Sequence, residues 1–192
     1  EPILRVKGLK SGNRVRGVDF EVHKGEILGI AGLMGSGRSE TLRALFGIDS
    51  IDEGDVYIQG GKVNIKTPND AIGAGLALVP EDRRVQGLVL DHDVKSNTIL
   101  PMLGNVTRRG LIDDTKVEAI VQEYVGKLNI KTDDIFKKAT LLSGGNQQKI
   151  VLAKWLINSP DILLLDEPTI GVDIGAKTEI MDIIREFADA DR

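Results

Sequence analysis

Short apolar runs alternate with amphipathic stretches along the chain, and this alternation predicts an α/β fold. Strands are expected at residues 26–31, 55–59, 76–79 and 162–165. Apolar residues spaced three and four apart predict helices at residues 39–46, 114–128 and 143–158, and a last helix over residues 180–187. Gly60–Gly61 predicts a turn after the strand at 55–59.

Composition excludes several classes of protein. The chain has 192 residues and no cysteine, so it cannot form disulfides, zinc knuckles or a thiol nucleophile. Its 25 Lys and Arg against 29 Asp and Glu give a net charge of −4, which argues against a general nucleic-acid binder. The longest stretch without charge, residues 96–107, is too short to span a membrane and contains Pro101. A single globular domain is expected.

A glycine-rich segment between the predicted strand at 26–31 and the helix at 39–46 matches the phosphate-loop pattern G-x-x-x-x-G-K-[ST] at all but one position. Backbone N–H groups of such a loop turn inward and cradle phosphate oxygens at a helix start. The exception is Arg38, where lysine is expected. The alternative is a glycine-rich turn that only joins strand to helix. The segment comprises Gly32, Leu33, Met34, Gly35, Ser36, Gly37, Arg38 and Ser39.

A second candidate is the apolar run at 162–165, which ends in Asp166 and Glu167. Carboxylates at the end of a buried parallel strand lie where doubly wound sheets bind ligands. Asp166 could hold Mg²⁺ and Glu167 could polarise an attacking water. The alternative is a strand that ends in solvated acidic residues.

A third segment lies 23 residues before Asp166 and starts the helix predicted at 143–158. Ser143 is a natural helix cap, and the glycines after it leave backbone N–H groups open to an anion. An ordinary Ser-capped helix start is the alternative. The order of phosphate loop, this turn and the acidic strand end resembles the ATP-binding-cassette (ABC) ATPases. The turn comprises Leu142, Ser143, Gly144, Gly145, Asn146 and Gln147.

The resemblance extends to the second cassette of bacterial monosaccharide importers of the ribose, galactose and xylose type. It rests on residues 32–38, 81–84, 87–89, 141–149 and 166–177. It implies one ABC ATPase domain over residues 1–192, with a P-loop NTPase core, a small antiparallel β subdomain and an α-helical subdomain. The core would occupy about 1–84 and 146–192, and the helical subdomain about 85–145.

The resemblance also implies ligands and roles. ATP and Mg²⁺ would be bound by Gly32, Leu33, Gly35, Ser36, Gly37, Arg38, Ser39 and Glu40, with Ser39, Asp166 and Glu81 at the metal and Glu167 as the catalytic residue. Leu142, Ser143, Gly144, Gly145 and Gln147 would act on the ATP of a partner cassette, and Asp173 would lie in the loop between cassettes.

The implied partners are a second, N-terminal cassette and membrane permease subunits, with a periplasmic or extracellular sugar-binding protein acting indirectly and no nucleic acid. The implied location is cytoplasmic, on the inner face of the bacterial membrane. The chain ends at Arg192, before the strand and switch residue that the resemblance implies, so a C-terminally truncated cassette is expected.

Four positions depart from the general cassette pattern. Arg38 replaces the phosphate-loop lysine, Glu40 stands where threonine is usual, and Glu81 stands where glutamine usually links Mg²⁺ to the permease. No aromatic residue precedes the loop at the usual adenine-stacking distance, where Val15 and Val18 are nearest. These departures predict weak ATP binding and slow or absent hydrolysis by this chain alone.

Two rival functions stay open at this stage. A nucleotide-binding regulator without turnover is favoured by Arg38 and Glu40 and opposed by Glu167. An ABC ATPase of nucleic-acid metabolism or translation would share the turn at residues 142–147, called here the signature turn. The coiled-coil type needs long insertions that the chain lacks, and the zinc-binding type needs cysteines. The pair Arg83–Arg84 is interpreted as solvated loop charge rather than a nucleic-acid site.

Overall fold

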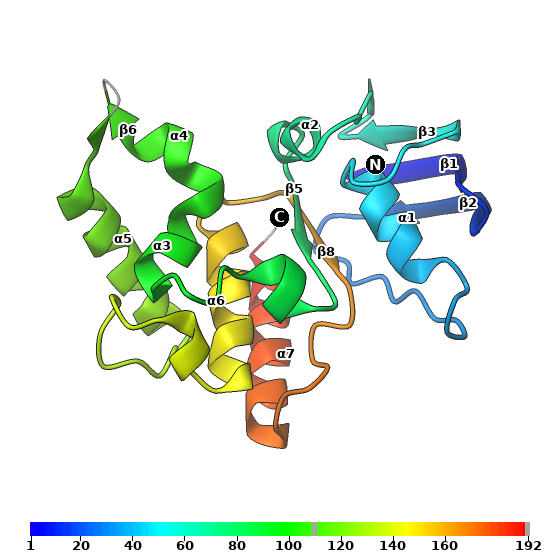
Figure 1. The fold of residues 1–192 in the computed structure, drawn as a ribbon. Helices are drawn as coiled ribbons and strands as arrows, with labels where there is room; N and C mark the ends of the chain where they lie inside the picture. The colour runs from blue at the N-terminus through cyan, green and yellow to red at the C-terminus, as the bar shows by residue number, and fades with distance from the viewer. Residues whose placement is uncertain (109–110, 191–192) are drawn as a thin grey trace. The chain divides into compact units, whose positions relative to one another are not determined.

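The computed structural model describes residues 1–108 and 111–190, so the terminal Arg192 lies outside the described residues. The chain divides into two compact units (Figure 1). The first consists of Glu1–Leu78, Pro160–Asp166 and Ile184–Arg192. The second consists of Val79–Ser159 and Glu167–Ile183. The predicted α/β class is confirmed.

A four-stranded antiparallel sheet forms the start of the first unit, in the order β2-β1-β3-β4. Its strands are β1 (Leu4–Ser11), β2 (Val15–Val22), β3 (Glu53–Ile58) and β4 (Gly61–Val63). The predicted strand at 55–59 corresponds to β3. The turn to β4 is formed by Gln59 and Gly60, not by Gly60–Gly61, and both have positive φ, 50° and 79°. Two-residue hairpin turns need that conformation.

The rest of the first unit confirms three predicted elements. Helix α1 (Arg38–Leu45) begins directly after the glycine-rich loop, and β5 (Leu76–Val79) and β8 (Ile162–Leu165) form a two-stranded sheet. Helix α2 (Pro68–Gly73) begins at a Thr67 cap with Asp70 completing a capping box. Strand β5 is buried along its whole length, as expected of a short continuous apolar run.

The predicted strand at residues 26–31 is not formed. No strand is assigned there, and Ile27, Leu28 and Ile30 are 55%, 40% and 42% exposed. A strand needs a neighbour to pair its backbone N–H and C=O groups. Within the described part of the chain no strand pairs with this run. Apolar composition alone was therefore insufficient, and this prediction was wrong.

The second unit is mainly helical (Figure 1). Helix α3 (Val94–Ile99) contacts α5 (Asp114–Lys127) and α6 (Gly144–Leu156), the two helices that the sequence predicted. Residues of α7 (Ile174–Asp189), the predicted last helix, are divided between the units. No helix among the described residues is long and apolar enough to cross a membrane. The remaining elements are η1 (Arg83–Gly87), η2 (Leu100–Met102), α4 (Leu103–Val106), β6 (Thr107–Arg108), β7 (Leu111–Ile112) and η3 (Ala139–Leu141).

Helix α6 is buried on nearly every face and carries two buried lysines. The Lys149 ammonium donates to the Asn129 carbonyl at 2.8 Å and forms an ion pair with Glu179. The Lys154 ammonium donates to the Gly87 carbonyl at 2.5 Å. Burial lowers the pKa of Lys154 from 10.5 to about 8. Charged Lys154 therefore destabilises the folded unit at neutral pH.

This burial predicts a stability that rises with pH. Below pH 8 the ammonium is protonated in both the folded and the unfolded chain, so the full cost of burying its charge is present. Above pH 8 the folded chain releases the proton while the unfolded chain keeps it up to its higher pKa, so unfolding becomes less favourable. Between pH 7 and 9.5 the unfolding free energy of the wild type should rise by about 2 kcal/mol relative to Lys154→Met. Urea denaturation of both variants measures this, and a pH-independent difference would contradict it.

Candidate functional site

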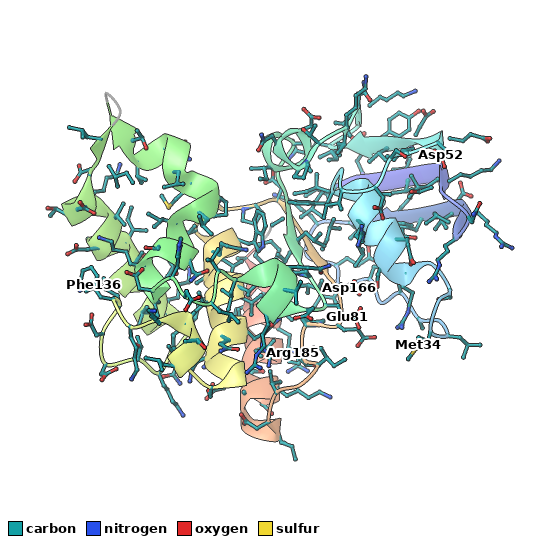
Figure 2. All side chains as sticks on the ribbon, in the orientation of Figure 1. Met34, Asp52, Glu81, Phe136, Asp166 and Arg185 are labelled. Carbon is teal, nitrogen blue, oxygen red and sulfur yellow. The ribbon has the colours of Figure 1, made fainter. Side chains whose placement is uncertain are left out.

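The glycine-rich loop is tightly folded in the first unit. Gly37 adopts a φ of 94° and caps α1, and a Cβ there would lie 2.7 Å from the Arg14 carbonyl oxygen. A Cβ at Gly32 would collide with the Ser36 hydroxyl. Met34 is 98% exposed (Figure 2). A larger side chain at Gly37 would therefore meet fixed backbone in a conformation that favours glycine, as expected of a backbone cradle for an anion.

The first turn of α1 carries three of the predicted nucleotide-binding residues. Arg38, Ser39 and Glu40 are all half-buried. The next residue, Thr41, closes the loop because its hydroxyl donates to the Gly37 carbonyl at 2.7 Å. Glu40 forms an ion pair with Arg14, in which the Arg14 Nη1 and Glu40 Oε1 atoms lie 3.0 Å apart. Glu40, which stands where threonine is usual, therefore has a cationic partner within its own unit.

Asp166 directly follows β8 and is half-buried. It is the last residue of the segment Pro160–Asp166, which belongs to the first unit. The pKa of Arg43 on α1 is raised, mainly because Arg43 donates a hydrogen bond to Asp49, and the charge of Asp166 contributes to the same shift. Asp166 and α1 both belong to the first unit. The predicted strand-end carboxylate and the loop thus belong to one unit.

The oxygen donors of this unit are suited to Mg²⁺. The Ser39 hydroxyl and the Asp166 carboxylate are hard ligands, and Mg²⁺ is usually held by one or two protein oxygens together with waters and substrate phosphates. In the described residues, no group of three or more His, Cys, Asp and Glu side chains gathers that could hold a metal without such help. The third predicted ligand, Glu81, belongs to the second unit and is exposed.

The signature turn lies in the second unit at the start of α6. Ser143 is the N-cap, and its hydroxyl accepts from the Asn146 side-chain amide at 2.9 Å and from its backbone N–H at 3.4 Å. The first turn of α6 contains no acidic residue of its own, which favours an anion at its positive end. Leu142 and Gln147 are buried, and the Gln147 amide donates to the Ala139 carbonyl at 3.0 Å.

The loop after β8 packs against the signature turn. A Cβ at Gly145 would collide with the Ala176 side chain and lie 3.8 Å from an Asp173 carboxylate oxygen. Asp173 accepts from the Ala176 N–H at 2.9 Å. Glu167, which opens this loop, is exposed and has a φ of 45°. A non-glycine residue in that conformation stores backbone strain and often marks a functional site.

Arg83 was missed as a site residue. Its guanidinium donates to the Ile170 carbonyl at 2.9 Å and to the Gly171 carbonyl at 3.0 Å. A Cβ at Gly144 would lie 2.6 Å from its Nη2 atom. Burial is the main reason that the pKa of Arg83 is lowered. The interpretation as solvated charge was therefore wrong for Arg83, which joins the loop of Asp173 to the signature turn.

Replacing Arg83 by methionine should loosen the loop at residues 170–173. Two carbonyls would lose a charged donor, and hydrogen bonds to charged groups contribute at most about 1.5–3 kcal/mol, less at an exposed site such as this one. We expect amide hydrogen exchange in residues 170–174 to accelerate about tenfold or more, with a lower unfolding midpoint. Arg84→Met is the matched control because Arg84 is exposed. Equal exchange in both variants would contradict the role of Arg83.

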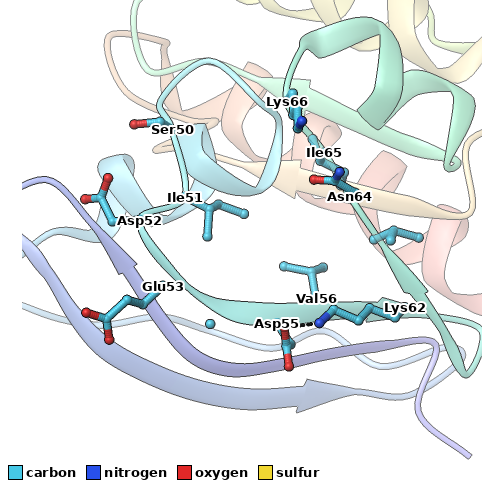
Figure 3. A pocket seen from close by; sticks show the side chains of 12 residues that line it. Ser50, Ile51, Asp52, Glu53, Asp55, Val56, Lys62, Asn64, Ile65 and Lys66 are labelled. Carbon is cyan, nitrogen blue, oxygen red and sulfur yellow. Dashed lines mark ion pairs between the residues drawn. The ribbon is translucent and has the colours of Figure 1, made fainter.

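An open groove of about 780 Å³ lies elsewhere in the first unit (Figure 3). It is lined by Ser50–Val56 and Lys62–Lys66, with Lys62 and Asp55 joined by an ion pair of 2.5 Å. None of the predicted site residues lines it. Charges of both signs and the absence of a phosphate cradle in its lining make it a poor candidate for nucleotide.

The order of loop, signature turn and strand end along the chain agrees with a family comparison. Residues 15–170 match the family model described as ABC transporter. The chain belongs to the ABC transporter family. The match covers both the phosphate loop and the signature turn, and it ends within the loop after β8.

Curated relatives show which members of the ABC transporter family this chain is similar to. The chain is 48% identical over 189 residues to a putative ribose/galactose/methyl galactoside import ATP-binding protein of Albidiferax ferrireducens. It is 47% identical over 188 residues to the ribose import ATP-binding protein RbsA of Geobacillus kaustophilus. Each alignment covers 98% of this chain and 38% of the relative. The chain therefore spans about two fifths of the length of these relatives.

Solved structures confirm the fold. An ATP-binding cassette in a dimeric post-hydrolysis state, bound to ADP and Pi, superposes with a TM-score of 0.81 at 25% identity and covers 98% of this chain and 84% of its own. Another ATP-binding cassette of an ABC transporter gives a TM-score of 0.83 at 22% identity, covering 99% and 78%. The predicted ABC-type α/β fold, with its antiparallel sheet and helices, is thereby confirmed.

Proposed function

We propose that this chain is the ATP-binding and hydrolysing cassette of a monosaccharide importer of the ribose and galactose type. The observation that carries the proposal is the 48% identity, over nearly the whole chain, to an import ATP-binding protein for ribose, galactose and methyl galactoside. The folded phosphate loop, the carboxylate at the end of β8 and the capped signature turn support it. The sugar itself would be selected by other chains.

In this proposal the first unit binds the nucleotide. Backbone N–H groups of Gly32, Leu33, Gly35, Ser36 and Gly37 cradle the phosphates, and Arg38 adds positive charge. Ser39 and Asp166 would hold Mg²⁺, and the resemblance to ABC cassettes assigns Glu81 as a further ligand. When bound, the ion neutralises charge that develops on the transferred phosphoryl group. Glu167 takes a proton from the attacking water.

The second unit would serve a partner cassette. In a head-to-tail pair, the start of α6 would complete the ATP site of the other cassette, with Asp173 near the boundary. The helical part, about residues 85–145, would dock on a membrane permease at the cytoplasmic face of a bacterial membrane. A sugar-binding protein outside the cell would act through the permease.

We further propose that this chain is the second of two cassettes in one polypeptide, with the nucleotide-binding core at about 1–84 and 146–192. The support is the modified phosphate loop, in which Arg38 replaces lysine. A planar guanidinium does not substitute freely for a compact ammonium. The two ATP sites of the pair would therefore differ in strength.

A second candidate is a regulatory cassette that binds nucleotide without turnover. Arg38 favours this alternative because it alters the residue that reaches the phosphates. Titration calorimetry with Mg²⁺–ATP tests binding by this chain, and phosphate release tests turnover. The first proposal expects weak binding and slow hydrolysis by the chain alone, and rapid hydrolysis in the full-length protein with its permease. Binding without turnover in that complete assembly would favour the regulator.

A further inference from the structure

The loop between β1 and β2 places a cation against the phosphate loop. Arg14 lies in this loop, and its Nη1 atom is 3.0 Å from the Glu40 carboxylate on the first turn of α1. All these residues belong to the first unit. Glu40 is 30% exposed and Arg14 is 58% exposed, so the pair lies at the surface where a ligand could reach it.

Backbone packing holds Arg14 in place independently of the ion pair. A Cβ at Gly37 would lie 2.7 Å from the Arg14 carbonyl oxygen and 3.2 Å from its carbonyl carbon. The Nη1 atom of Arg14 is 3.5 Å from the position of a Cβ at Gly35. The Arg14 main chain therefore touches one glycine of the phosphate loop while its guanidinium lies beside another. This placement is built into the fold.

The ion pair of Arg14 and Glu40 reduces the negative charge beside the phosphate loop. A carboxylate in the first turn of a helix is favourable in the empty loop because it complements the helix dipole. The same carboxylate repels a polyphosphate that enters the cradle. The Arg14 guanidinium, paired with Glu40, offsets that repulsion.

We propose that Arg14 is a charge-compensating residue of the nucleotide site, which neutralises Glu40 so that the phosphate loop accepts a polyphosphate. The proposal rests on the proposed nucleotide-binding function. It makes Arg14 a positioning residue, since it acts through Glu40. Its effect should grow with the charge of the ligand, and it should be nearly absent for a ligand without phosphates.

A double-mutant cycle on this chain tests the coupling. The dissociation constant of Mg²⁺–ATP is measured by titration calorimetry for the wild type, Arg14→Ala, Glu40→Gln and the double variant. Arg14→Ala should weaken binding about tenfold, and the double variant should return to within about threefold of Glu40→Gln. Arg14→Lys should keep most of the affinity. Arg16→Ala, which removes a nearby arginine whose Nε donates to the Asn13 carbonyl, is the matched control.

Inorganic tripolyphosphate is the second probe, because it carries the charge without the base, and adenosine is the third. The order of affinities found for ATP should repeat with tripolyphosphate, and adenosine should show no dependence on Arg14. Wild-type affinity in Arg14→Ala, or a double variant as weak as Arg14→Ala, overturns the proposal. Equal losses for ATP and adenosine also overturn it. If tripolyphosphate follows the expected order while ATP does not bind, the charge role holds and the proposed nucleotide function fails.

Discussion

Replacing Ser143 by arginine should lower the ATP turnover of the complete two-cassette transporter by about 100-fold or more. The start of α6 carries backbone N–H donors, a serine cap and no acidic residue in its first turn. In the proposed head-to-tail pair these donors stabilise the γ-phosphate held by the partner cassette, and removing one such donor typically costs about 10²–10³ in rate. An arginine side chain would block the helix start with bulk. Phosphate release in the presence of the permease measures the effect.

Two further variants separate the causes. Ser143→Ala removes the cap hydrogen bonds to Asn146, which contribute about 1 kcal/mol to the helix, without adding bulk. It should therefore cost much less turnover than Ser143→Arg. Arg38→Ala should also do less, because it strikes this chain's own modified loop and leaves the partner's site complete. If Arg38→Ala abolishes turnover while Ser143→Arg stays near wild type, the assignment of the two sites is reversed.

Replacing Glu167 by glutamine should abolish most hydrolysis at this chain's own site and spare ATP binding. The amide has nearly the same shape as the carboxylate but cannot accept a proton from water, and general bases contribute about 10²–10⁴ in rate. Removal of a negative charge next to Asp166 should leave ATP affinity unchanged or higher. Single-turnover hydrolysis and titration calorimetry measure the two quantities in the full-length protein.

The matched control is Glu186→Gln, which removes an exposed carboxylate of α7. It should leave both hydrolysis and binding unchanged. The backbone of Glu167 has a φ of 45°, and glutamine can adopt that conformation at the same cost. A loss of binding in Glu167→Gln would therefore assign this residue to the nucleotide or metal instead of the proton transfer. Hydrolysis near the wild-type rate at this chain's own site, measured with the partner cassette's site inactivated, would contradict its catalytic role.

The elements with local signals could be predicted from the amino-acid sequence alone. Helix α5 followed from apolar residues at helical spacing, β5 and β8 from short apolar runs, and the start of α6 from the Ser143 cap. The glycine pattern around Gly37 also determined the phosphate loop, because a φ of 94° is accessible mainly to glycine. The helix, cap and glycine signals depend on neighbours only a few residues away. The runs of β5 and β8 were visible locally, but the two strands form because they pair with each other.

The contacts of Arg14 and Arg83 and the absence of a strand at residues 26–31 became evident only in the folded chain. Arg83 binds the carbonyls of Ile170 and Gly171, which follow it by more than 80 positions, and Arg14 meets Glu40 across 26. An arginine carries the same side chain in a solvated loop and in such a contact, so composition could not distinguish them. Residues 26–31 have a strand's composition, but a strand forms only where another segment supplies its hydrogen bonds.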